Sequence, residues 1–222
     1  MMILELKQVR KSFGKDQTYV EALKPVDFSI DKGKLVAIIG PSGSGKSTLL
    51  TIAGLLQGPT EGQVIINGKD VSKLSEKERS KVRLNEIGFI LQASNLVPFL
   101  KVKDQFKLLD KVKKDHMSKS ELEKEIEQIG LSKVLNQFPN ELSGGQKQRV
   151  AILKALYTNP SIILADEPTA SLDGEKAIEV IKLLRDEVKT KDKAGIVVTH
   201  DHRLLDYFDE IYEMNDGQLT RK

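Results

Sequence analysis

Residues 40–47, GPSGSGKS, constrain the fold more than any other part of the chain. They match the pattern G-x-x-x-x-G-K-[ST] and stand between an apolar run expected as a strand (35–39) and the start of an apolar helix. In such a strand–loop–helix unit, the glycines let backbone N–H groups wrap around phosphate groups, and the helix N-terminus adds its positive end. The segment therefore predicts a phosphate-binding loop at the end of a strand.

Strand-like and helix-like segments alternate along the chain, which is typical of an α/β fold with a largely parallel core sheet. Runs expected as strands lie at 3–9, 26–30, 35–39, 63–66, 87–91, 161–165 and 195–199. Capping boxes predict helix starts at Ser75 and Ser118, and the whole stretch from 95 to 158 has a helical pattern. A helical stripe (177, 181, 184 and 188) and a hairpin turn at 215–217 complete the prediction.

Composition and charge bound the possible functions. The 222 residues suit one domain with a sizeable core, and the absence of cysteine excludes disulfides and thiol chemistry. A net charge of +3 does not indicate a nucleic-acid partner, and the mixed-charge stretch 101–127 is interpreted as a solvated helix face. The start of the chain does not resemble a signal peptide, and no apolar run could span a bilayer. We expect a cytosolic protein that reaches a membrane only through a partner.

Four side chains are candidates for chemistry on the bound phosphates. Lys46 is expected to reach the β- and γ-phosphates, and the Ser47 hydroxyl is expected to ligate Mg²⁺. Asp166 and Glu167 follow an apolar strand run. Asp166 suits Mg²⁺, which prefers oxygen and keeps bound waters, and Glu167 suits the general base that orients the attacking water. In a sequence without a phosphate-binding loop, this acidic pair would be interpreted as two surface residues at the end of a strand.

Gln92 and His200 also follow apolar strand runs. Ligands collect at the carboxyl ends of strands in α/β sheets, so Gln92 could supply an oxygen to Mg²⁺ and His200 could sense the γ-phosphate. Alone, Gln92 carries no signal, and a single histidine at a strand end is more often structural.

A second glycine motif, NELSGGQ at 140–146, precedes a run of helix formers. Ser143 alone would be enough to cap that helix. The two glycines that follow leave N–H groups open to close approach, at a helix start that attracts anions. The motif is therefore interpreted as a second phosphate-binding element, and the residues do not say whose phosphate it binds.

Together and in this order, these motifs resemble the ATP-binding subunit of ABC transporters over the whole chain. The Leu-Ser-Gly-Gly-Gln motif is the most specific, because other P-loop classes lack it. The resemblance implies an ATP hydrolase of α/β class: a P-loop NTPase core with a mostly parallel sheet, an antiparallel β subdomain and an α-helical subdomain. It implies one domain, in which 1–92 and 159–222 form the nucleotide-binding core with the β subdomain and 93–158 form the helical subdomain.

The resemblance also implies roles for individual residues. Gln92 corresponds to the Q-loop, residues 170–173 to the D-loop and His200 to the switch histidine. An upstream aromatic residue stacks on adenine: by position we choose Phe13, with Tyr19 as the alternative. The implied catalytic residues are Glu167, His200, Lys46 and Gln92. The implied Mg²⁺ ligands are Ser47, Gln92 and Asp166. The implied ATP contacts are Phe13, Gly40, Pro41, Ser42, Gly43, Ser44, Gly45, Lys46, Ser47, Thr48, Ser143, Gly144, Gly145, Gln146 and Asp173.

Partners follow from the same resemblance. In this family two subunits pair head to tail, and the Ser-Gly-Gly segment (143–145) of one closes on the γ-phosphate held by the other. The chain is similar to ATPases that serve FtsX/MacB-like permeases, and its segments 89–102 and 199–207 are similar to those of haem-exporter ATPases of Gram-positive bacteria. This implies an ATP-dependent homodimer, an integral-membrane permease in two copies, and a place on the inner face of the cell membrane. The apolar residues Leu96, Val97, Phe99 and Leu100 could form a groove for a permease helix or belong to the core.

The leading function is an exporter motor for haem or another hydrophobic or amphiphilic cargo. The alternative is an ATPase that regulates a membrane protein controlling cell-wall hydrolases, and no residue separates the two. Soluble ABC ATPases of DNA repair or translation carry coiled-coil insertions or a second ATPase copy, which this sequence lacks. GTPases are disfavoured because the guanine-reading N-K-x-D motif is absent, residues 67–70 being NGKD.

Overall fold

Two sheets organise the chain in the computed structural model, which describes residues 1–222. The antiparallel sheet has the strand order β2-β1-β4-β5, and the larger sheet has the order β10-β9-β3-β8-β7-β6. Strands β9, β3, β8, β7 and β6 of the larger sheet are parallel to one another, and β10 is antiparallel at its edge. The predicted α/β class with a mostly parallel sheet is thus confirmed.

The strands lie where the apolar runs predicted them. The antiparallel sheet contains β1 (Met2–Phe13), β2 (Val20–Asp31), β4 (Glu61–Ile66) and β5 (Lys69–Asp70). The larger sheet contains β3 (Lys34–Ile39), β6 (Ile87–Ile90), β7 (Ile162–Asp166), β8 (Ala194–Val198), β9 (Glu210–Asn215) and β10 (Gln218–Arg221). Both β1 and β2 extend well beyond their apolar runs, because their backbones continue to pair out to Phe13 opposite Val20.

The helices are α1 (Lys46–Ala53), α2 (Glu76–Glu86), α3 (Val102–Asp110), α4 (Lys119–Gln128), α5 (Gly144–Tyr157) and α6 (Gly174–Thr190). Ser75 and Ser118 cap α2 and α4 through reciprocal capping boxes, as predicted. The expectation of a helical pattern throughout 95–158 was wrong for residues 95–101, which form no helix. A buried side chain from α3 holds this segment in a loop, a long-range effect that a local pattern does not contain.

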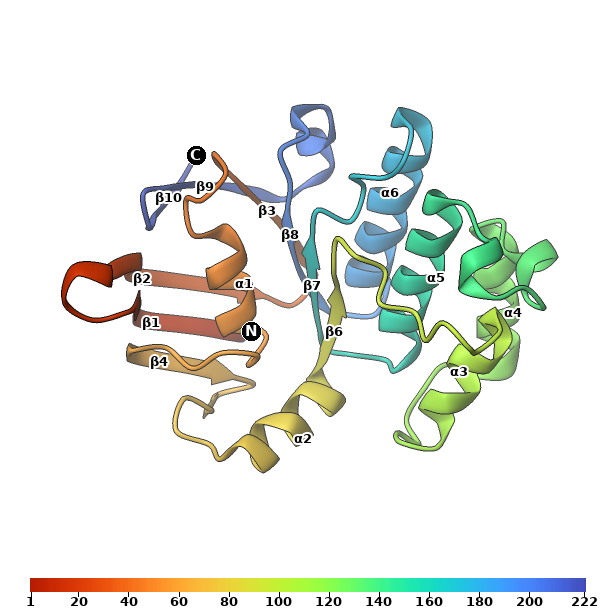
Figure 1. Cartoon of the computed structure of the whole chain (residues 1–222), viewed down its shortest axis with the longest axis horizontal. Coiled ribbons are helices and arrows are strands. Elements are labelled where there is room, and N and C mark those ends of the chain that lie inside the picture. Colours follow the sequence, from red (N-terminus) through yellow and green to blue (C-terminus); the bar gives the residue numbers. More distant parts are fainter.

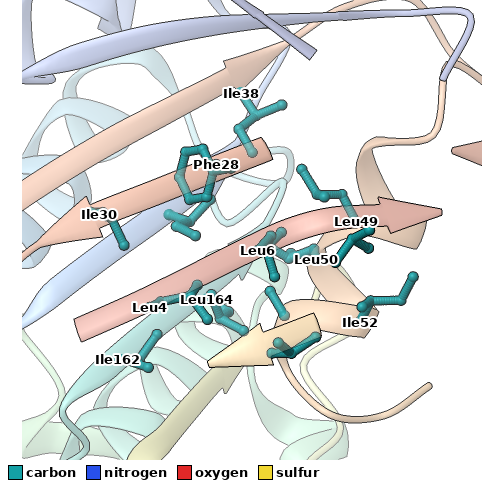
Figure 2. Close-up of a cluster of buried hydrophobic side chains, with 14 of the residues drawn as sticks. Leu4, Leu6, Phe28, Ile30, Ile38, Leu49, Leu50, Ile52, Ile162 and Leu164 are labelled. Atoms are coloured by element: carbon teal, nitrogen blue, oxygen red, sulfur yellow. The ribbon is translucent and has the colours of Figure 1, made fainter. Parts of the chain in front are cut away.

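The larger sheet is covered on both faces (Figure 1). Helix α1 lies between the two sheets, whereas α5 and α6 cover the opposite face and α3 and α4 lie beyond α5. Side chains alternate accordingly: Val36 and Ile38 belong to the cluster on the α1 side, and Leu35 belongs to the cluster on the α6 side. Figure 2 shows the first cluster, in which Leu4 and Leu6 of β1 meet α1 and the core strands. The loops that follow the carboxyl ends of the core strands, and the helix starts beyond them, are therefore anchored by buried strands.

Beyond α6, the aspartate at position 209 ties three elements together. Its carboxylate accepts a hydrogen bond from the Leu35 backbone N–H at 2.8 Å and pairs with Lys189 Nζ at 2.6 Å. Burial opposes ionisation of Asp209, but these two donors outweigh it and hold the pKa of the carboxyl below its ordinary value.

No helix of the protein is both long and apolar enough to cross a membrane.

Replacing Asp209 with asparagine is expected to lower the free energy of unfolding by about 1–3 kcal/mol, because two charge-assisted hydrogen bonds are weakened. A depressed native pKa stabilises above the unfolded-state pKa of about 3.9 and stops doing so as pH falls through the native value. The difference from wild type should therefore be constant between about pH 5 and 8 and shrink below about pH 4. Urea titrations at several pH values measure it. The matched Asp206→Asn change, at an exposed aspartate, should have no such effect.

Candidate functional site

The phosphate-binding loop runs from the end of β3 to the start of α1. Gly40, Gly43 and Gly45 have φ angles of +145°, +78° and +107°, which favour glycine. A Cβ on Gly40 would lie 2.1 Å from the Met214 carbonyl oxygen, so β9 packs directly against the loop. In the turn between β9 and β10, the Gly217 N–H donates to the Ser44 carbonyl at 3.0 Å. The β9–β10 hairpin thus supports the loop from behind, while nothing fills the space in front of Gly43.

A cavity of about 440 Å³ opens in front of this loop. It brings together most of the predicted site from the ends of four strands, β3, β6, β7 and β8, and from the start of α1. The lining residues are Ala22, Gly40, Ser42, Gly43, Gly45, Lys46, Ser47, Thr48, Gln92, Asp166, Glu167, Val198 and His200. Pro41 and Ser44 do not line it, and Ser44 is only 5 % exposed.

Lys46 is the only lysine or arginine on the cavity wall. Its Nζ donates to the carbonyl oxygens of Gly40 and Pro41, at 2.8 and 2.7 Å, and pairs with no carboxylate. A cation held by neutral carbonyls keeps its full charge for an anion in the cavity, and the N-terminus of α1 adds to the positive potential there. This part of the site therefore suits a polyphosphate.

Two carboxylates face the phosphate-binding loop across the cavity. Asp166 ends β7, and its side chain has no protein hydrogen-bond partner. Glu167 follows with φ +48°, a left-handed conformation that costs a non-glycine residue about 1 kcal/mol or more. Its N–H donates to the Val198 carbonyl at 3.0 Å, which fixes the strained residue against β8. The backbone thus directs a half-buried carboxylate toward the place where phosphates would bind.

His200 contacts this carboxylate directly. The Nδ1 atom lies 2.8 Å from Glu167 Oε1, while 74 % of the histidine side chain and 16 % of the glutamate side chain are exposed. The pair joins the loops after β7 and β8. His200 can therefore orient Glu167 and still reach a ligand in the open cavity.

A metal ion in this cavity would depend on a bound phosphate group and on water for several of its ligands. The structure contains no group of three or more His, Cys, Asp or Glu side chains able to hold one. Ser47, Gln92 and Asp166 do line one cavity together, and they offer a hydroxyl, an amide and an unpaired carboxylate. This oxygen-rich set suits Mg²⁺, which is bound through a few protein oxygens together with phosphates and waters.

The second glycine motif lies at a different cavity, of about 480 Å³. Ser143 caps α5 with a reciprocal box, in which its Oγ accepts from the Gln146 N–H and Gln146 Oε1 accepts from the Ser143 N–H. Gly144 and Gly145 follow on the cavity wall. Asp173 caps α6 beside them, and its hydrogen bonds from the Lys176 side chain and backbone hold the pKa of its carboxyl below the ordinary value. No residue of this wall belongs to the first cavity.

The two aromatic residues predicted to contact adenine do not line the first cavity. Phe13 is 42 % exposed at the end of β1, with Lys11 Nζ 5.0 Å from its ring centroid, and it does not line the cavity. Tyr19, 50 % exposed, does not line it either. Ala22 and Val198 line it instead: Val198 is the last residue of β8, two positions before His200, whereas nothing in the sequence signals Ala22. Which aromatic residue stacks on adenine stays a prediction.

The apolar segment before α3 is divided between two environments. Leu96 packs against the second core cluster, whereas Phe99 is 77 % exposed. Val97 and Leu100 are half-buried. The two alternatives for this segment, core and contact surface, therefore apply to different residues.

Comparisons with known proteins define the class to which this fold and site belong. The ABC transporter family model matches residues 23–170, so the chain belongs to the ABC transporter family. It is the ATP-binding, ATP-hydrolysing subunit of such a transporter.

Particular relatives are similar over nearly their full length. A Staphylococcus saprophyticus protein with the provisional name hemin import ATP-binding protein HrtA is 46 % identical over 221 residues, which cover 99 % of both chains. The Staphylococcus aureus MRSA252 protein of the same name is 44 % identical, over 99 % of this chain and 100 % of its own. The dimeric ATP-binding cassette MJ0796, in a post-hydrolysis state bound to ADP and Pi, aligns with a TM-score of 0.88 and 38 % identity over 99 % of this chain and 98 % of its own.

Proposed function

We propose that two copies of this chain bind head to tail around two ATP molecules. The observation that carries the proposal is the separation of the two glycine motifs into cavities that share no residue. Each cavity then forms half of a composite site, and a two-fold axis completes both sites at once. The dimeric state of MJ0796 supports the pairing of two copies. Ser143, Gly144 and Gly145 of one copy would contact the γ-phosphate held by Lys46 of the other.

ATP hydrolysis in each composite site would use the residues on the wall of the first cavity. Lys46 would neutralise the β- and γ-phosphates, and Glu167 would accept a proton from the attacking water. Ser47, Gln92 and Asp166 would hold Mg²⁺, which would neutralise charge on the phosphates. His200, bonded to Glu167, would keep the base oriented and contact the γ-phosphate. Loss of the γ-phosphate would remove the contacts between the two copies and let them part.

The dimer would drive an integral-membrane permease of FtsX/MacB-like type, present in two copies, from the inner face of the cell membrane. Support comes from Phe99, which is 77 % exposed. It lies between Val97 and Leu100, whose carbonyls accept hydrogen bonds from the buried Gln105 side chain. In this proposal residues 1–92 and 159–222 form the nucleotide-binding core, and residues 93–158 form the helical subdomain that touches the permease.

The proposed cargo is haem or another hydrophobic or amphiphilic molecule, moved outward. The staphylococcal relatives support a haem-related role by name, although that name states import. Outward movement rests on the resemblance of segments 89–102 and 199–207 to haem-exporter ATPases. A regulator of cell-wall hydrolases remains the alternative, since it would use the same ATPase cycle.

Capture of the membrane partner tests this proposal. Tagged Glu167→Gln protein, loaded with ATP, serves as bait for detergent-solubilised membranes of the source organism. Glu167→Gln with Lys46→Ala serves as the matched bait, in which ATP binding is expected to be weakened about 100-fold. We expect the first bait alone to retain a small permease with a large extracellular domain. A cell-wall-linked partner would favour the regulator. Retention of no membrane protein would contradict both.

Growth phenotypes then test the cargo and its direction. Removal of the chain should make an exporting strain several-fold more sensitive to added haem. If the chain serves import, the same deletion should instead abolish growth on haem as the iron source.

A further inference from the structure

The stretch 101–127, which is mixed in charge along the sequence, is sorted by charge in the folded chain. Residues 101–114 contain six lysines and two aspartates, so this short segment has a larger positive charge than the net +3 of the whole chain. Helix α4, by contrast, contains four glutamates and two lysines. The basic charge is therefore concentrated on α3 and on the residues that follow it, at the edge of the molecule beyond α5 (Figure 1).

Helix α3 buries one side against α5 and exposes the other. Lys103, Lys107 and Lys111 are exposed and follow one another at intervals of four residues, so they form one stripe along the helix. Leu108 and Val112, also four residues apart, are 44 % and 54 % exposed and come directly after two of these lysines. These five residues are called the α3 face below.

The lysines of the α3 face are only partly neutralised by the protein itself. Lys103 and Lys111 make no ion pair, and Lys107 pairs with Asp104 Oδ1 at 3.0 Å. The second aspartate of the helix, Asp110, accepts a hydrogen bond from a tyrosine hydroxyl of α5 instead. The face therefore presents uncompensated ammonium groups beside exposed apolar side chains.

The apolar residues of this region are not isolated cases of surface exposure. Of the eleven large apolar or aromatic residues that are exposed in the chain, three lie between positions 99 and 112: Phe99, Leu108 and Val112. A single exposed apolar side chain needs no explanation, whereas a group of them bordered by one sign of charge marks an interaction surface.

The chemistry of the α3 face favours a lipid surface over a protein or a nucleic acid. The face contains lysine and no arginine, and protein interfaces are depleted in lysine and enriched in arginine, whose planar fork matches a fixed carboxylate. A surface for single-stranded nucleic acid carries aromatic side chains on which bases stack, whereas the apolar side chains of this face are aliphatic. Lysine instead suits mobile phosphates, because its long stem lies along apolar groups while its ammonium stays in water.

We propose that the α3 face binds a membrane surface that contains anionic lipids. The ammonium groups of Lys103, Lys107 and Lys111 lie among the headgroup phosphates, and Leu108 and Val112 reach the boundary of the acyl chains. The segment that carries the proposed permease contact directly precedes α3, so the two contacts would be adjacent on one side of the molecule. The lipid contact belongs to this chain alone and does not require the permease.

Co-sedimentation of the purified full chain with vesicles tests the proposal. The probes are phosphatidylcholine vesicles with and without phosphatidylglycerol, and we expect binding to the anionic vesicles alone. Binding should weaken as salt is raised, since screening shortens the range of the attraction to about 3 Å at 1 M. Combining Lys103→Gln, Lys107→Gln and Lys111→Gln should lower the partition coefficient about 100-fold, because each basic residue contributes about fivefold. Leu108→Ser with Val112→Ser should lower it about tenfold.

Matched variants separate the α3 face from general charge. Lys119→Gln, Lys124→Gln and Lys133→Gln together remove the same charge from exposed positions outside the face and should change binding less than about threefold. Arginine at all three lysine positions of the face keeps the charge and should preserve binding, since mobile headgroups require charge and no fixed geometry. Wild-type ATP hydrolysis by each variant shows that it is folded. Equal binding to both kinds of vesicle, or equal losses in the two glutamine triple variants, overturns the proposal.

The capture of a permease described above is an independent result. If anionic vesicles bind the chain but no permease is retained, the α3 face stands and the proposed membrane partner fails. If a permease is retained and the vesicles do not bind, the lipid contact fails. Loss of permease capture in the glutamine triple variant of the face, without vesicle binding by wild type, assigns the face to a protein partner and likewise overturns the inference.

Discussion

Replacing Glu167 with glutamine is expected to reduce ATP hydrolysis by about 10³-fold or more while ATP binding persists, because a general base contributes about 10²–10⁴-fold. The amide keeps the shape of the carboxylate but cannot accept the proton from the attacking water. The variant should therefore hold unhydrolysed ATP and accumulate as a dimer. Phosphate release measures the first effect, and light scattering after size-exclusion chromatography in ATP and Mg²⁺ measures the second.

Several controls keep this prediction specific. Glu127→Gln makes the same change on an exposed position of α4 and should leave hydrolysis and oligomeric state unaltered. ADP in place of ATP should give monomer. Glu167→Gln protein that stays monomeric in ATP would count against the sandwich, and wild-type turnover in this variant would remove Glu167 from the role of base.

Lys46→Ala is expected to weaken ATP binding about 100-fold and to leave no measurable hydrolysis. Lys46 supplies the only lysine or arginine cation of the cavity, and its Nζ is free of any carboxylate. Each charge-assisted hydrogen bond to phosphate is worth about 1.5–3 kcal/mol, so loss of two such bonds accounts for a factor of this size or larger. Equilibrium titration with a fluorescent ATP analogue measures the affinity.

The Lys46→Ala protein should also lose most of its thermal stabilisation by ATP and Mg²⁺, since a ligand stabilises the folded state by RT ln(1 + [L]/Kd) and Kd is raised in this variant. Lys133→Ala, at an exposed position, provides the matched loss of a charge. Normal turnover by Lys46→Ala protein would invalidate the assignment of the phosphate-binding loop.

Local sequence patterns predict much of the fold correctly, because the features concerned are themselves local. Apolar runs place the core strands, the capping boxes at Ser75 and Ser118 start α2 and α4, and Gly130, with φ +67°, follows the end of α4. The phosphate-binding loop is predictable for the same reason: its glycines, lysine and serine are contiguous.

The parts that sequence patterns do not predict depend on contacts between distant residues. Residues 95–101 have a helical pattern, yet the buried Gln105 holds them in a loop. The bonds from Gln148 and Lys154 to the carbonyls of Leu91 and Asn95 span 57 and 59 positions. The separation of the two glycine motifs into different cavities is likewise a property of the folded chain, since only the folded chain shows that Ser143 and Lys46 line different walls.

The β9–β10 hairpin has a practical consequence for work with this protein. Its turn donates a hydrogen bond from Gly217 to Ser44, and Met214 packs its carbonyl against Gly40. The last strand is therefore not a dispensable tail: cutting the gene after Met214 would leave the back of the phosphate-binding loop open to water. Library mutagenesis should therefore treat the turn at 215–217 together with the phosphate-binding loop that it supports.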